Sequence, residues 1–138
     1  MKLSTAFGLT LLLALAAALA ETDEVPTVAE ESTLSWLSLT DRGEYEQSWS
    51  DAASLFQAAI SSADWVRSLK AARSPLGQLE SREVSSATFS RTLPGAPDGE
   101  YAVFKFSASF ENKASAIETV TAMKDQDETW RVAGYFVK

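Results

Sequence analysis

The chain has 138 residues, a formal net charge of −7, and neither histidine nor cysteine. The missing side chains exclude a Ser-His-Asp triad, a cysteine nucleophile, a disulfide scaffold and any imidazole or thiolate ligand for zinc or copper. The surplus of negative charge repels phosphate backbones, so nucleic acid is not an expected partner.

The first twenty residues have the layout of a secretory signal peptide. Lys2 is followed by a run rich in Ala and Leu over residues 6–19, and the run ends in Ala18-Leu19-Ala20 before Glu21. A basic tip, a short apolar segment and a small-x-small site are typical of a cleaved leader, and the run is shorter than the ~20 residues that cross a bilayer. We therefore predict cleavage between Ala20 and Glu21, export, and no membrane insertion of the processed chain.

Processing would leave 118 residues with 11 basic and 19 acidic side chains, a formal charge of −8. This is the size of one domain that can bury a core without covalent staples. Residues 21–28 are acidic, contain Pro26 and lack periodicity, so they predict a flexible arm. Residues 29–138 are assigned to a single α+β domain.

The apolar pattern predicts three helices. The first spans residues 29–39. The second begins at Asp41, which can cap it because Glu44 follows at the spacing of a capping box. The third begins at Ser62 as N-cap and ends at Ser74-Pro75. The second helix presents one stripe with steps of three and four residues, which comprises Tyr45, Trp49, Ala52, Phe56 and Ile60.

Four strands are predicted after Gly77, over residues 79–92, 100–110, 115–124 and 129–138. Residues 100–110 alternate most clearly, with an apolar core side that comprises Ala102, Phe104, Phe106, Ala108 and Phe110. Short connections rich in Gly, Pro and Asp favour antiparallel neighbours. The predicted architecture is three N-terminal helices packed on one face of a four-stranded antiparallel meander.

The last strand has apolar residues in both phases. Trp130, Val132 and Phe136 are expected on one side, and Ala133, Tyr135 and Val137 on the other. Such a sheet needs cover on its second face, from a partner subunit, a ligand or part of the chain itself. The candidate contact residues on that face are Tyr101, Val103, Lys105, Ala133, Tyr135 and Val137.

A small-molecule pocket between helices and sheet is the alternative, and its candidate lining comprises Trp49, Trp65, Arg73 and Arg82. Arginine can bind an anionic ligand, although pairing with the abundant carboxylates is the simpler role. An isomerase-type enzyme could use a buried carboxylate with a tyrosine, but no spacing singles out a pair among Asp51, Asp64, Glu118, Tyr101 and Tyr135. A protease inhibitor with residues 93–97 as a wedge is a third hypothesis.

No metal or cofactor site is predicted. Asp125-x-Asp127 begins like a calcium loop, but Trp130 stands where the loop requires glycine and Phe136 where it requires glutamate. A polar hairpin turn explains this segment better.

Five short motifs occur in order along the chain. They are Asp41-x-Gly43-x-Tyr45-x-x-Ser48-Trp49, Arg73-Ser74-Pro75-Leu76-Gly77, the run from Leu93 to Tyr101, Glu118-Thr119-Val120-Thr121, and the run from Trp130 to Val137. Together they resemble the domain of unknown function 4019 family, small exported bacterial proteins, over about residues 36–137. The resemblance implies an envelope location, with the periplasm expected and the extracellular space as the alternative, and brings no activity.

The order of elements is also similar to the cystatin or nuclear-transport-factor-two type of roll, in which a curved sheet wraps helices. Such rolls serve enzymes, carriers and interaction modules alike, so this likeness selects no function. We expect a non-catalytic module that acts by protein contact, with a homodimer or an envelope protein as partner. A small-molecule binder or isomerase remains the alternative.

Overall fold

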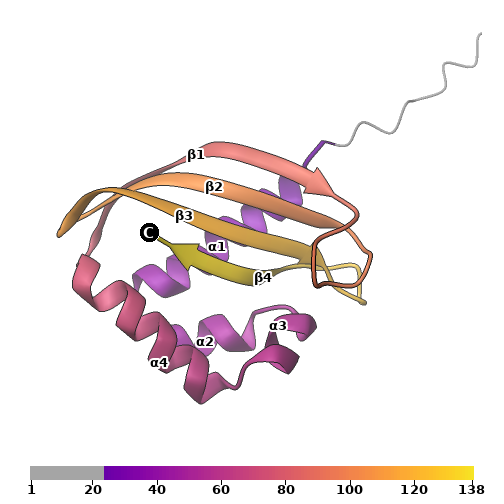
Figure 1. Cartoon of the computed structure of the whole chain (residues 1–138), viewed down its shortest axis with the longest axis horizontal. Helices are drawn as coiled ribbons and strands as arrows, with labels where there is room; N and C mark the ends of the chain where they lie inside the picture. The colour runs from indigo at the N-terminus through magenta and orange to yellow at the C-terminus, as the bar shows by residue number, and fades with distance from the viewer. Residues whose placement is uncertain (1–23) are drawn as a thin grey trace, which may run out of the picture.

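The computed structural model describes residues 24–138, so the predicted signal peptide, its cleavage site and the start of the acidic arm lie outside the described residues. Within residues 24–138 the chain forms four α-helices, one short 3₁₀ helix and one four-stranded sheet (Figure 1). The helices are α1 (Thr27–Asp41), α2 (Tyr45–Ser50), α3 (Ser54–Ala59), α4 (Ser62–Arg73) and the 3₁₀ turn η1 (Ser74–Leu76). The strands are β1 (Leu79–Ser90), β2 (Tyr101–Phe110), β3 (Lys113–Lys124) and β4 (Trp130–Val137).

The α+β class and the antiparallel meander are confirmed, with strand order β1-β2-β3-β4. The sheet curves, α1 passes behind it, and α2, α3 and α4 lie below β4 in the same view (Figure 1). We call the face packed against α1 the inner face and the opposite one the outer face. Among the described residues, no helix is long and apolar enough to span a membrane.

The core forms where the inner face of β2 and β3 meets α1 and α4. Phe104 and Phe106 of β2 are fully buried, as predicted from the alternation of that strand. Each such ring contributes roughly 2–3 kcal/mol by leaving water. The core cluster comprises Ala29, Trp36, Leu37, Trp65, Leu69, Ala102, Phe104, Phe106, Val120, Ala122, Trp130 and Val132.

The predicted second helix is wrong, because its single stripe is divided between α2 and α3. Ala53 is extended, with φ −62° and ψ 151°, and its N–H donates to the Val132 carbonyl of β4 at 2.8 Å. The bond to the sheet takes the donor that a continuous helix would use. The predicted caps are wrong as well. Asp41 ends α1 instead of capping the next helix, and Ser61, not Ser62, caps α4 by accepting from the Asp64 N–H.

A β-bulge at Ala133 changes the phase of β4. Thr121 pairs with Gly134 and Ala122 pairs with Val132, so Ala133 has no partner of its own on β3. Residues beyond a bulge point to the opposite side from the one that simple alternation predicts. The expected grouping of Phe136 with Trp130 and Val132 is therefore wrong, since Phe136 lies 59% exposed while Trp130 and Val132 are buried.

Gly77 provides a test of the connection between η1 and β1. Its φ is +73°, and an added Cβ would lie 2.8 Å from Glu111 Oε2 and 2.9 Å from Glu111 Cβ. Gly43 has a similar φ of +75° with nothing within 4 Å of the added Cβ. We predict that Gly77→Ala lowers the free energy of unfolding by about 1–3 kcal/mol more than Gly43→Ala, as measured by urea denaturation. Equal losses would show that the contact with Glu111 is unimportant.

Candidate functional site

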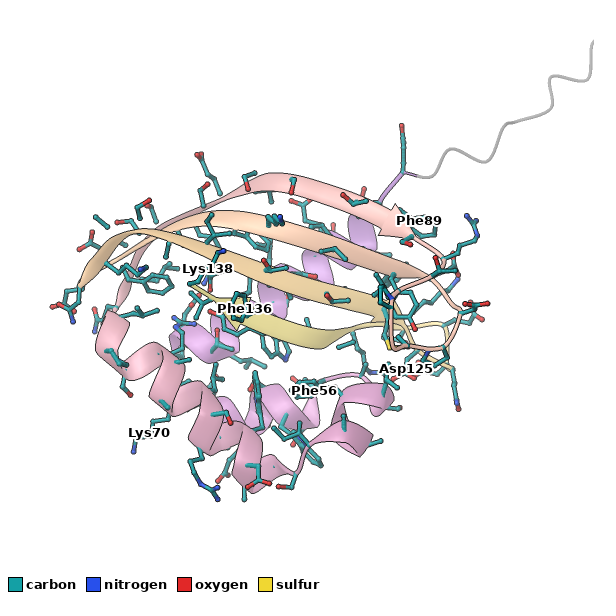
Figure 2. The ribbon with its side chains drawn as sticks, in the orientation of Figure 1. Phe56, Lys70, Phe89, Asp125, Phe136 and Lys138 are labelled. Carbon is teal, nitrogen blue, oxygen red and sulfur yellow. The ribbon has the colours of Figure 1, made fainter. Side chains whose placement is uncertain are left out.

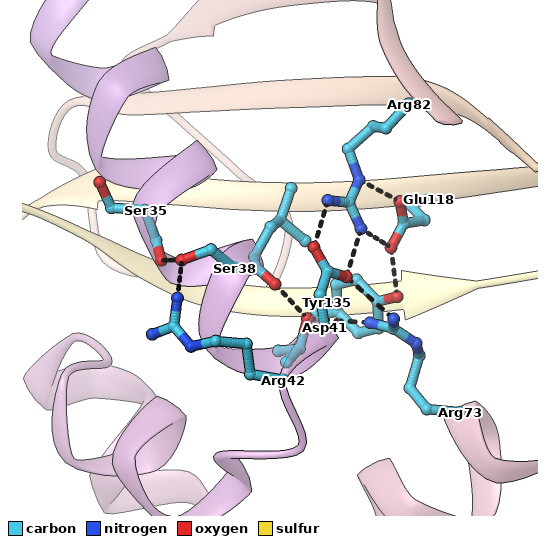
Figure 3. Close-up of polar contacts among 10 residues, drawn as sticks. Ser35, Ser38, Asp41, Arg42, Arg73, Arg82, Glu118 and Tyr135 are labelled. Carbon is cyan, nitrogen blue, oxygen red and sulfur yellow. Dashed lines mark hydrogen bonds and ion pairs between the residues drawn. The ribbon is translucent and has the colours of Figure 1, made fainter. Parts of the chain in front are cut away.

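A cluster of charged side chains joins the ends of α1 and α4 to the inner face of the sheet (Figure 3). Arg82 of β1 donates to Asp41 Oδ2 at 2.7 Å and to Glu118 Oε1 of β3 at 2.6 Å. Arg73 of α4 donates to Asp41 Oδ1 at 2.9 Å, and Tyr135 of β4 donates to Glu118 Oε2 at 2.5 Å. The structure therefore brings together Arg73 and Arg82, two of the predicted ligand residues, around two carboxylates.

The cluster holds two positive and two negative groups and is withdrawn from water. The side chains of Glu118 and Arg73 are 0% and 4% exposed. Burial by itself would raise the pKa of Asp41, but its hydrogen bonds and charge contacts with Arg82 and Arg73 outweigh burial and hold this pKa below its usual range. Burial, reinforced by the negative charge of Glu118, raises the pKa of Tyr135, which remains a neutral donor.

The contacts of this cluster suit a structural role better than a catalytic one. Glu118 and Tyr135 do form the carboxylate–tyrosine pair that an isomerase would need, and sequence spacing gave no hint of it. Both Glu118 oxygens already accept hydrogen bonds from Arg82, and one accepts from Tyr135 as well. A general base needs an oxygen that a substrate can reach, which the buried Glu118 does not offer.

The predicted aromatic lining is used for packing. Trp65 donates its indole N–H to Ser48 Oγ at 2.9 Å and meets Phe56 edge-on, with ring centroids 4.8 Å apart. Trp49 donates to the Ile60 carbonyl at 2.8 Å. Each indole N–H therefore has a partner inside the protein, with Trp65 in the main core and Trp49 packed against it.

The outer face of the sheet can be read as rows of side chains that run across the strands. The strand registers define three rows, and within each row the residues follow the order β1, β2, β3, β4. The first row is Glu83, Ser107, Ile117 and Lys138; the second is Ser86, Lys105, Thr119 and Phe136; the third is Thr88, Val103, Thr121 and Gly134. Five of these twelve residues are serine or threonine and three are charged, so the expectation of an apolar second face is only partly met.

The predicted contact residues divide between the two faces. Val103 and Lys105 lie on the outer face, and Ala133 is the bulge residue. Tyr135 and Val137 are placed wrongly by the prediction. The bulge turns them inward, where Tyr135 packs on the main core and Val137 on a smaller apolar cluster.

Tyr101 is only 1% exposed, so it offers no surface to a partner. It lies outside the main core cluster, and its hydroxyl donates to the Pro97 carbonyl of the β1–β2 loop. The loop also brings Gly99 against the ring, since a Cβ added there would lie 3.5 Å from Tyr101. Part of the chain itself therefore covers this end of the sheet, one of the three possibilities the sequence left open.

Sequence reasoning missed Ile117 and Phe136 as outer-face residues. Ile117 is 45% exposed and Phe136 is 59% exposed. Ile117 is in phase with Thr119 and Thr121, so simple alternation of β3 could have placed it on this face. Phe136 could not be placed in this way because the bulge lies between it and Val132.

Two hollows on the surface of the described residues differ from the predicted pocket, and of its four expected lining residues only Arg82 borders either of the two. One of about 720 Å³ lies between α1 and β4, with Ser35, Arg42, Asp51 and Arg131 in its lining. Another of about 450 Å³ is lined by β1, β2 and β3, including Glu83, Ser107 and Ile117. Within residues 24–138, no group of three or more Asp and Glu side chains is placed to hold a metal ion.

The chain belongs to the family described as "Protein of unknown function (DUF4019)", whose model matches residues 32–135. This confirms the resemblance drawn from the ordered motifs. Neither a curated protein nor a solved structure matches the chain significantly. The family assignment carries no activity, so any function has to be argued from the geometry above.

The contacts of the charged cluster indicate that the stability of the fold depends strongly on Arg82. Replacing it with methionine leaves Asp41 short of a partner and Glu118 buried with one fewer cation, a change that typically costs about 3–5 kcal/mol. We predict a loss of that size for Arg82→Met in urea denaturation. The matched control is Arg42→Met, which breaks the exposed Arg42–Glu44 pair and should cost less than about 1 kcal/mol. Similar losses for the two variants would contradict a special role for the cluster.

We expect Asp41 to stabilise the folded protein at neutral pH and to lose this effect in acid. Because its pKa is depressed in the folded protein, the unfolded chain takes up the proton first as the pH falls below about 5. The stabilising contribution is complete above the ordinary carboxyl pKa and declines on acidification. We predict that Asp41→Asn flattens the fall of unfolding free energy between about pH 5 and pH 2. Asp98→Asn, the same change on an exposed loop, should leave the fall as steep as in the parent protein.

Proposed function

We propose that this protein is an exported, non-catalytic binding module, active in the periplasm after removal of residues 1–20, and that it contacts another protein through the outer face of its sheet. The observation that carries the proposal is the exposure of two large apolar side chains, Phe136 and Ile117, in adjacent rows of that face. Diagonal neighbours in adjacent rows are within reach of each other's side chains. Exposed apolar side chains that neighbour each other within a polar rim support a contact site more than isolated ones do.

The distribution of other exposed apolar residues supports this choice of face. Val28 and Leu34 belong to α1, Leu55 to α3 and Val84 to β1. None of these lies in the three outer rows, whereas Phe136 and Ile117 share the face with Val103. Lys138 flanks the pair at the end of the first row and remains exposed, as a charged residue at the rim of an interface does.

The export part of the proposal is supported by the layout of residues 1–20 alone. The likeness to a cystatin or nuclear-transport-factor-two roll is likewise proposed, and the curvature of the sheet around α1 supports it (Figure 1). The small-molecule and isomerase alternatives gain no support from the charged cluster, because its acidic oxygens are occupied and Glu118 is buried.

Site-directed photocrosslinking tests the contact face. A benzoylphenylalanine placed at position 136 in the full chain should form adducts in intact cells, because Phe136 lies at the proposed interface. The matched control is the same group at position 28, where Val28 is similarly exposed on α1. We predict that the adduct yield at position 136 exceeds that at position 28 by at least about tenfold.

Two further readouts make the test decisive. The proposal requires the adduct in the periplasmic fraction, with Glu21 as the first residue of the purified chain. Phe136→Thr should leave unfolding within about 1 kcal/mol of the parent, because threonine suits a strand and the position is exposed. Equal adduct yields at positions 136 and 28 would overturn the proposal.

A further inference from the structure

We infer that the outer face binds a second copy of this chain, with a two-fold axis that lies in the interface, parallel to the strands and between β2 and β3. This inference rests on the proposed function, since it names the partner at the same face. It is carried by the order of large and small side chains in the three rows described above.

Such an axis places β1 of one protomer over β4 of its partner, and β2 over β3. A two-fold contact is isologous, so every pair of residues that it forms occurs twice. Each row would face the same row of the other protomer in reverse order. Stacked sheets are about 10 Å apart, and their facing side chains must therefore interdigitate.

The rows satisfy this requirement at the positions of the two exposed apolar residues. Phe136 would face Ser86 of the other copy, and Ile117 would face Ser107. In the third row Val103 would face Thr121, and Thr88 would face Gly134. In three of these pairs a larger side chain meets a smaller one, and Val103 and Thr121 are of similar size, so the two exposed apolar groups are covered without collision. The hollow of about 450 Å³ that Ser107 and Glu83 help to line adds room close to the first row.

The charged residues of the face favour the same arrangement. Glu83 and Lys138 occupy the two ends of the first row, and the proposed axis sets each of them against the other in the second copy. In the part of the chain that the structure describes, neither forms an ion pair, so both charges are free to pair between copies. Phe136 and Lys138 lie close together at the end of β4 (Figure 2).

The competing two-fold arrangement is electrostatically poor. An axis perpendicular to the strands through the second row would set Lys105 against Lys105 and Phe136 against Phe136. Like charges brought together at an interface weaken the contact strongly. With the axis parallel to the strands, Lys105 instead faces Thr119, whose hydroxyl accepts a hydrogen bond, and the two copies of Lys105 lie about one strand spacing, ~4.8 Å, apart across the sheet and are not directly opposed.

Charge reversal tests the second copy and its geometry together. We predict that the purified chain dimerises in sedimentation velocity experiments, and that Glu83→Lys and Lys138→Glu each weaken the dimer at least about tenfold, because each change creates two like-charge contacts. The double variant Glu83→Lys with Lys138→Glu should recover the parent affinity to within about threefold. Glu31→Lys, the same charge change on an exposed position of α1, is the control and should leave the dimer intact.

The outcomes separate this inference from the proposed function. A chain that stays monomeric at every concentration, or a dimer that the single reversals leave unchanged, overturns the inference. If position 136 then still gives a periplasmic adduct with a different protein, the proposed function stands and the second copy does not. If position 136 gives no more adduct than position 28, the outer face is not a contact site and both fall. An adduct of twice the chain mass, weakened by either reversal, supports both.

Discussion

The carboxylate of Asp41 connects the helical layer to the sheet, because it accepts hydrogen bonds from Arg73 and Arg82 at the same time. Arg73 ends α4 and Arg82 lies in β1, so one side chain fixes three elements that are distant in sequence. The connection continues through Glu118 to β3 and through Tyr135 to β4. Charges this deeply buried are tolerated only when every one has a partner, which makes the set of four charges act as a unit.

The two faces of the sheet differ in composition because one packs against helices and the other is exposed to water. The inner face carries phenylalanine, valine and alanine, which fill the space against Trp36 and Leu37 of α1. The outer face carries mostly serine, threonine and charged residues, which are readily hydrated, and Ile117 and Phe136 are its large exposed apolar residues. Nothing in the packing of the single chain requires a phenylalanine at position 136. This is the reason to connect that residue with a partner and not with stability.

The sheet could be predicted from the sequence in large part, since the alternation over residues 100–110 is clear and its neighbours follow short turns. The bulge at Ala133 could not, because residues 130–137 are apolar in both phases and either phase looks suitable for a core. The interruption between α2 and α3 at Ala53 could not be predicted for a related reason. The helical stripe continues through it, and only the bond to Val132, a residue far along the chain, interrupts the helix. The charged cluster depends on pairings between distant residues, which no local pattern reports.

The bond between Ala53 and Val132 has a further consequence for how copies of this chain can assemble. It occupies an acceptor on the free edge of β4, while the opposite edge strand, β1, is interrupted by register shifts near Glu80 and Ser85 and turns the charged Arg82 inward. Irregular and charged edges resist the addition of further strands. Open-ended growth into filaments by strand addition is thereby discouraged at both sides of the sheet.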